Sequence, residues 1–236
     1  MKENNSAGKF IIFEGIDGSG KSTQSKLFRR YLEKKGLDVV EISFPQYGKK
    51  SAGLVEEYLS GKYGNSREVG PYRASIFFAC DRYDASFQIK KWLNDGKIVI
   101  ADRYVSSNAG HQGGKMSDSK ERTDFLTWLY DLEYNIFNIP KPDIVFILKT
   151  SSQIAQKMSG KVTDEDKKKK KASFLGKKKR DIHELNLEHL DNALKSYLEL
   201  AEKFSNHFRV IECLSDKGLL PIEIIHQKII EEYNKS

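Results

Sequence analysis

Short apolar runs, rich in β-branched and aromatic residues, alternate along the chain with stretches of helical periodicity. The apolar runs occupy residues 10–13, 39–44, 98–101, 144–148 and 208–211. They are nearly continuous, which is typical of strands covered on both faces. Helical spacing occurs over residues 21–35, 72–93, 182–206 and 221–233. This alternation predicts an α/β fold, a three-layer sandwich with a doubly wound, five-stranded parallel sheet flanked by helices.

Two segments interrupt the pattern. Residues 110–120 are rich in Gly, Ser and His and predict a loop. Residues 159–180 are rich in Lys, lack apolar periodicity and predict a mobile excursion from the domain. A chain of 236 residues fits a single domain spanning residues 1–236, and the Lys-rich excursion at residues 159–181 belongs to it.

The net charge of +7 is concentrated in one place. Residues 161–180 contain ten Lys or Arg and three Asp or Glu, so this segment accounts for the whole excess. A nucleic-acid-binding protein more often spreads positive charge along a face, which makes nucleic acid an unlikely partner. For residues 167–171 alone, a functional role and a solvated tract remain equally open.

The remaining composition points to the cytoplasm. The longest apolar runs are too short to cross a bilayer, so we expect no membrane association. Residues 1–8 lack the apolar stretch of a secretory signal. The two cysteines, Cys80 and Cys213, do not form a metal or disulfide motif, and a reducing compartment suits them.

The strongest chemical signal is Gly-Ile-Asp-Gly-Ser-Gly-Lys-Ser at residues 15–22, which fits the phosphate-binding loop G-x-x-x-x-G-K-[ST] in full. A strand-like run precedes it and a helical pattern follows. The glycines allow backbone N–H groups to turn toward phosphate oxygens, Lys21 supplies a charge to the β- and γ-phosphates, and Ser22 can bind Mg²⁺. The residues expected to bind ATP are Gly15, Ile16, Asp17, Gly18, Ser19, Gly20, Lys21, Ser22 and Thr23.

A P-loop alone does not separate a kinase from a GTPase, although the guanine-reading motif N-K-x-D is absent. Asp102 follows an apolar run, so it should emerge at the carboxyl end of a strand, where it can hold Mg²⁺ through water. Arg103, next to it, can clamp phosphate oxygens. Phe78 and Arg82 lie four residues apart on one helical face and could stack on a base and bind its edge, although core packing is the stronger reading for residues 76–79 by themselves.

Longer motifs join these features in a fixed order. They read FEGIDGSGKSTQ at 13–24, FPQYG at 44–48, FACDRY at 78–83, DRYVSSNAGHQG at 102–113 and KPD at 141–143. Together they resemble the thymidylate kinase family, and the resemblance runs nearly from end to end. It implies transfer of the γ-phosphoryl group of ATP to dTMP with Mg²⁺ present, small-molecule nucleotide partners, and a homodimer through helices near residues 72–93 and 124–134.

The same resemblance implies roles for individual residues. Lys21, Arg103, Asp17 and Arg180 would be catalytic. The Lys-rich residues 159–181 would form a mobile lid, and Arg180 would supply a cation from it because residues 16–19 contain none. The metal would be held by Ser22, Asp102 and Asp17. The acceptor-binding residues would be Asp17, Phe44, Pro45, Phe78, Arg82, Arg103, Ser107, Asn108, His111 and Gln112.

The sequence departs from the family pattern near the acceptor. Gln46 and Tyr47 stand where an arginine is common, and Arg73 or Lys49 could replace it. His111 stands where Tyr or Phe is common. Two other functions stay open: a kinase acting on a deoxynucleoside or another monophosphate, and a nucleotide- or nucleic-acid-binding module that uses the lysine tract.

Overall fold

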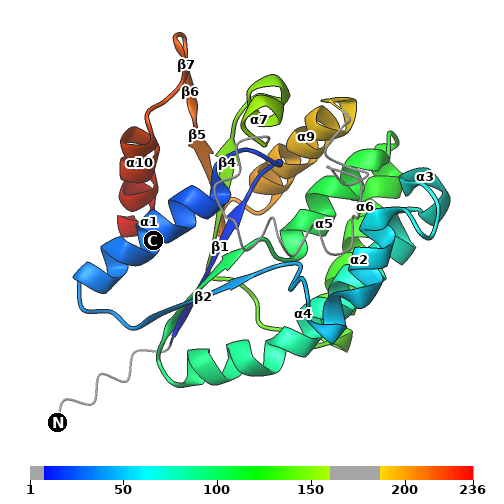
Figure 1. Ribbon diagram of the computed structural model, residues 1–236, viewed down its shortest axis with the longest axis horizontal. Helices are drawn as coiled ribbons and strands as arrows, with labels where there is room; N and C mark the ends of the chain where they lie inside the picture. Colours follow the sequence, from blue (N-terminus) through cyan, green and yellow to red (C-terminus); the bar gives the residue numbers. More distant parts are fainter. Residues whose placement is uncertain (1–7, 160–186, 236) are drawn as a thin grey trace.

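The computed structural model describes residues 8–159 and 187–235. Its centre is a parallel sheet with the strand order β2-β3-β1-β4-β5 (Figure 1). The strands are β1 (Lys9–Glu14), β2 (Val39–Ser43), β3 (Ile98–Asp102), β4 (Ile144–Lys149) and β5 (Phe208–Glu212). The predicted five-stranded parallel sheet is therefore confirmed, with strand bounds within one or two residues of the apolar runs.

Helices cover both faces of the sheet, and two apolar cores result. On one face, α1 (Lys21–Lys34) and α10 (Ile222–Asn234) pack against residues such as Ile11 and Phe13. On the other face, α4 (Pro71–Asn94), α5 (Val105–His111) and α9 (Leu187–Lys203) pack against residues such as Phe10 and Ile12. Successive residues of β1 alternate between these two cores, so the continuous apolar run is buried on both sides, and the three-layer sandwich is confirmed.

The remaining elements are shorter. They are η1 (Lys50–Ala52), α2 (Gly53–Ser60), α3 (Ser66–Val69), η2 (Gly113–Lys115), α6 (Ser119–Tyr130), the π-helix η3 (Asp131–Ile136), α7 (Ser152–Ser159), β6 (Leu214–Ser215) and β7 (Gly218–Leu219). No helix within the described ranges is both long and apolar enough to cross a membrane.

The predicted loop at residues 110–120 is wrong in part. Helix α5 continues to His111, η2 follows, and α6 begins at Ser119. The predicted helix 182–206 corresponds to α9 within the described part of the chain. The lid prediction, residues 159–181, lies outside the described residues except for Ser159, which ends α7.

Candidate active site

The phosphate loop connects β1 to α1 and takes a glycine-dependent conformation. Gly15, Gly18 and Gly20 have φ values of 136°, 86° and 94°, which favour glycine. A Cβ at Gly18 would also lie 1.9 Å from the carbonyl oxygen of Ala155 on α7. The loop therefore depends on glycine both for its turn and for its close approach to α7.

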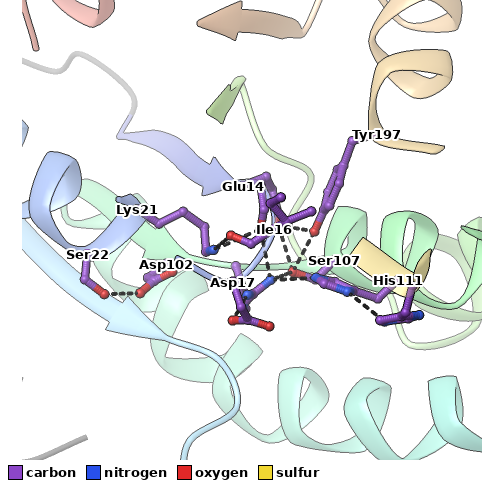
Figure 2. A network of polar contacts seen from close by, with 12 residues as sticks. Glu14, Ile16, Asp17, Lys21, Ser22, Asp102, Ser107, His111 and Tyr197 are labelled. Atoms are coloured by element: carbon purple, nitrogen blue, oxygen red, sulfur yellow. Dashed lines mark hydrogen bonds and ion pairs between the residues drawn. The ribbon is translucent and has the colours of Figure 1, made fainter. Parts of the chain in front are cut away.

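Lys21 and Ser22 begin helix α1 and reach in different directions (Figure 2). Lys21 Nζ donates to the carbonyl oxygens of Gly15 and Ile16 at 2.9 and 2.8 Å, which places its ammonium over the loop. Ser22 Oγ donates to Oδ2 of Asp102 at 2.7 Å. Strands β1 and β3 are neighbours, and Phe13 pairs with Asp102, so the end of β3 brings this carboxylate beside the loop.

Arg103 connects the phosphate loop to α5. Its φ of 76° is unusual for a residue with a side chain, and the backbone is strained there. Its Nη2 pairs with Oδ1 of Asp17 at 2.6 Å, and its Nη1 lies 3.4 Å from the carbonyl oxygen of Gly15. The same Nη1 donates to Ser107 Oγ at 3.2 Å and lies 3.2 Å from His111 Nε2. Burial opposes the charge, but the fields of Asp17 and other acidic groups outweigh burial and raise the pKa of Arg103 well above its usual range.

Glu14, at the end of β1, accepts hydrogen bonds from the turn that follows Arg103, and this residue was not predicted from the sequence. Its fully buried carboxylate accepts hydrogen bonds from the backbone N–H of Tyr104 and from the hydroxyl groups of Ser106, Ser107 and Tyr197, at 2.7 to 2.9 Å (Figure 2). These donors come from the start of α5 and from α9. A buried carboxylate with four donors is well satisfied, and it ties β1 to both helices.

A pocket opens beside the loop and Arg103. Its cavity volume is about 70 Å³, several times the space that one water molecule needs. Its lining includes every residue predicted to bind the acceptor, together with three residues that were not predicted to bind it: Tyr47, Leu59 and Tyr104. The structure therefore gathers Asp17, Phe44, Pro45, Phe78, Arg82, Arg103, Ser107, Asn108, His111 and Gln112 around one cavity.

Arg82 lies at the buried end of this pocket and is held by Glu133, a second residue that sequence reasoning missed. The guanidinium pairs with the Glu133 carboxylate through two nitrogens, with Nε 3.0 Å from each oxygen. Burial works against the charge of Arg82, but the field and hydrogen bonds of Glu133 raise its pKa, so the group stays charged. Arg82 Nη1 then donates to Asn108 Oδ1 at 3.2 Å.

Other predicted residues lie elsewhere. Thr23 is exposed on the first turn of α1, and its backbone N–H donates to the carbonyl oxygen of Gly20. Arg180 lies outside the described residues. Arg73 does not line the pocket, because its guanidinium donates to the backbone carbonyls of Glu68 and Val69. Lys49 donates to Gln46, which is itself bonded to Asp81.

A doubly wound sheet with a P-loop at the end of its central strand, next to an arginine-lined pocket, defines a small-molecule kinase of the P-loop class. The model of the thymidylate kinase family matches residues 13–229. The chain therefore belongs to the thymidylate kinase family. It is accordingly a transferase of nucleotide biosynthesis, a nucleoside monophosphate kinase that phosphorylates dTMP with ATP as co-substrate.

Individual relatives agree over most of the chain. A probable thymidylate kinase of Thermococcus kodakarensis is 34% identical over 229 residues, which cover 94% of this chain and 95% of the relative. The thymidylate kinase of Plasmodium falciparum is 32% identical over 159 residues, 67% of this chain and 70% of the relative. The solved structure of the Candida albicans thymidylate kinase matches with a TM-score of 0.71 at 23% identity, covering 97% of this chain and 93% of that one, and it shows the shared fold.

Proposed function

We propose that this kinase holds ATP on the loop 15–23 and dTMP in the neighbouring pocket, and that Arg103 aligns the two. The observation that carries this proposal is the position of Arg103, which lines the pocket and contacts both Gly15 and Asp17 of the loop. A guanidinium at that junction can bind the acceptor phosphate in a planar fork. The acceptor phosphate would compete with Asp17 for Nη2 of Arg103.

The reaction needs little acid–base chemistry from the protein. The second pKa of a phosphate monoester is about 6, so the attacking oxygen is already anionic at neutral pH. The barrier lies in bringing two polyanions together while charge moves between them. We therefore assign catalysis to Lys21 and Arg103 as cations, with Asp17 orienting Arg103 or contacting the sugar hydroxyl.

Magnesium fits the donor set at the loop. Ser22 and Asp102 offer a hydroxyl and a carboxylate, the hard oxygen ligands that Mg²⁺ prefers, and Asp17 offers another carboxylate. Within the described ranges, no group of three or more His, Cys, Asp or Glu side chains is placed so that it could hold a metal ion. This suits an ion bound by one or two protein oxygens plus phosphate and water. When bound, it would neutralise charge on the phosphates.

For the acceptor, we assign Phe78 to stacking on the base and Arg82 and Asn108 to hydrogen bonds with its edge. The walls of the base site would be Phe44 and Pro45. The remaining lining residues, Ser107, His111 and Gln112, would contact the sugar and base.

We also assign Arg180 as a cation for the phosphates of ATP, because residues 16–19 of the loop contain no arginine or lysine. Arg180→Ala should lower kcat strongly while the KM for dTMP stays nearly constant. An unchanged kcat would remove this assignment.

The enzyme is further proposed to be a cytoplasmic homodimer. Ile76, Tyr83 and Phe87 on α4 are 40%, 42% and 62% exposed, and their spacing places them along one face of the helix. An exposed apolar stripe of this kind favours a helix-mediated dimer. The free cysteines Cys80 and Cys213 suit a reducing compartment.

Steady-state ADP release, measured with varied dTMP and varied ATP, tests the separate roles assigned to Arg103 and Lys21. Arg103→Ala should raise the KM for dTMP at least tenfold, because the acceptor phosphate loses a charge-assisted pair of roughly 1.5 to 3 kcal/mol. Lys21→Ala should act mainly through kcat. Arg30→Ala, at an exposed position on α1, serves as the control.

Alternative acceptors separate this proposal from the competing kinase functions. dTMP, dUMP, ribouridine monophosphate and thymidine are offered side by side to the wild-type enzyme. Thymidine lacks the anion that Arg103 would bind, so turnover of thymidine comparable to that of dTMP would contradict the acceptor assignment.

A further inference from the structure

Lys115, at the end of η2, is a half-buried cation with an unusual environment. Its Nζ donates to Gln112 Oε1 at 2.6 Å and to the hydroxyl of Tyr58 at 3.1 Å, and it lies 5.9 Å from the centre of the Tyr58 ring. No Asp or Glu in the described part of the chain forms an ion pair with it. Burial lowers the pKa of Lys115 to about 7.

This arrangement is costly for stability, because a charge is removed from water without a counter-ion. A methionine of similar length would fill the same space at lower cost. Local arrangements that oppose stability are expected where a residue serves function. The nearest functional feature is Gln112, which lines the acceptor pocket.

A protonated lysine can only donate, so the atom of Gln112 that faces it is the carbonyl oxygen. The two ends of a carboxamide point apart, and the amide nitrogen is therefore turned away from Lys115. Gln112 is only 2% exposed as a whole, but its Nε2 is not among the fully buried unpartnered atoms of the described residues, and no hydrogen bond from it to another described residue is formed. Because Gln112 lines the pocket, this amide nitrogen can donate to a ligand bound there.

Asn108 repeats the pattern on the same pocket. Its Oδ1 accepts from Arg82 Nη1, a cation that cannot accept in return. Its Nδ2 is buried and has no partner within the described ranges. Two lining amides thus have their oxygen atoms held by cations and their nitrogen atoms left to donate.

We propose that Lys115 is a positioning residue for the acceptor base: by holding Oε1 of Gln112, it keeps the amide nitrogen available to donate to a carbonyl oxygen of the base. With Asn108, the pocket offers two amide donors, which suits a base that carries carbonyl oxygens and disfavours one with an amino group in the same place. This inference rests on the acceptor pocket proposed above.

A double-mutant cycle tests it, using the full chain with ATP and Mg²⁺. The variants are Lys115→Met, Gln112→Ala and the double variant, with Lys120→Met as a matched control at an exposed position on α6. The KM and kcat for dTMP are measured well below pH 7, where Lys115 with a pKa of about 7 is mostly protonated, together with the inhibition constant of dCMP as a competitor. Thermal unfolding confirms that each variant is folded.

We expect Lys115→Met and Gln112→Ala each to raise the KM for dTMP about tenfold, the size of one hydrogen bond, with kcat within about twofold. Because Lys115 acts through Gln112, the double variant should match Gln112→Ala. In Lys115→Met the amide is free to turn its oxygen to the pocket, so the ratio of the dCMP inhibition constant to the dTMP KM should fall. Lys120→Met should behave as the wild type.

Two outcomes would overturn the inference without contradicting the acceptor pocket. One is an unchanged KM for dTMP in Lys115→Met. The other is a KM raised about a hundredfold in the double variant, because independent effects of the two residues would multiply. An unchanged KM in Gln112→Ala would instead remove Gln112 from the acceptor contacts, and the inference would fall with that part of the proposed function.

Discussion

Burial of the Lys115 ammonium group should lower the free energy of unfolding of this protein by an amount that depends on pH. In the unfolded chain its pKa is the ordinary 10.5, whereas burial lowers it to about 7 in the folded protein. The folded state therefore binds the proton less tightly, and the penalty is complete below about pH 7. It shrinks as the pH rises from about 7 toward 10.5 and vanishes above that range.

Lys115→Met should accordingly raise Tm at neutral pH, and the gain should diminish steadily as the pH is raised toward 10. The measurement is a series of thermal unfolding curves of both proteins across this range. The lost hydrogen bonds to Gln112 and Tyr58 reduce the gain but do not change its pH dependence. A difference in Tm that does not vary with pH would contradict the burial argument, and Lys120→Met shows the effect of removing an exposed lysine.

Gly18 carries a second prediction at the residue scale. Gly18→Ala combines a positive φ with a Cβ that would meet the carbonyl oxygen of Ala155, so the loop or α7 must move. We expect a lower Tm and at least a tenfold loss of ATP affinity, measured by calorimetric titration. Gly53→Ala is the matched control, because Gly53 is helical with φ of −56° and open space around it. Wild-type ATP affinity in Gly18→Ala would show that the loop tolerates the displacement.

Residues in local motifs could be predicted from the sequence, and their distant partners could not. Gly15, Lys21 and Ser22 share one contiguous pattern whose chemistry is encoded in its spacing. Glu14 and Tyr197 meet across 183 positions, and Arg82 meets Glu133 across 51. No periodicity in a single sequence encodes such pairs, because the sheet and helix packing that joins them is a property of the folded chain.

The same contrast holds for whole elements. The strands were predictable because each is a short apolar run, and the three central strands β1, β3 and β4 are buried on both faces. Helix α5 was not, because its sequence Val-Ser-Ser-Asn-Ala-Gly-His has no apolar period. Its first turn is instead anchored by Glu14, which accepts from Tyr104 N, Ser106 and Ser107. Gly110, which suggested a loop, is a packing requirement, since a Cβ there would lie 2.5 Å from the ring of Tyr197.

Helix α9 is joined to Glu14 of β1 through the hydroxyl group of Tyr197, and Tyr197→Phe tests the contribution of this hydrogen bond. The variant keeps the ring against Gly110 but removes the donor to Glu14. A hydrogen bond to a buried carboxylate contributes roughly 1.5 to 3 kcal/mol, so the free energy of unfolding should fall by about that amount. We also expect a lower kcat, because Glu14 supports the turn that carries Arg103.

Denaturant unfolding and steady-state kinetics measure both effects. Tyr31→Phe, at a partly buried position on α1 and remote from Glu14, is the control. If Tyr197→Phe lowers stability and leaves kcat unchanged, α9 stabilises the fold without influencing the geometry of Arg103.

At the scale of the whole molecule, the strand order explains why the donor and acceptor sites adjoin. Because β1 and β3 are parallel neighbours, the loop after β1 and the Asp102–Arg103 turn after β3 emerge at the same edge of the sheet. One arginine can then touch both sites. Helix α4 also supplies Phe78 and Arg82 to the pocket. A partner subunit docked on the outer face of α4 would therefore contact the same helix that lines the acceptor site.

This geometry gives the last prediction, which concerns assembly. Phe87 is the most exposed member of the α4 stripe, at 62%, and Phe87→Glu would place a charge in the proposed dimer interface. Two copies related by a twofold axis would each bury that charge, so we expect dissociation to monomers, measured by sedimentation at several concentrations. Leu37→Glu, at an exposed apolar position between α1 and β2, introduces the same charge on another surface and should leave the assembly unchanged.

A monomeric wild-type protein would refute the dimer, and a dimeric Phe87→Glu variant would show that the interface lies away from this stripe. If the dimer does separate, a rise in the KM for dTMP without a change in the KM for ATP would connect the α4 interface to the acceptor pocket.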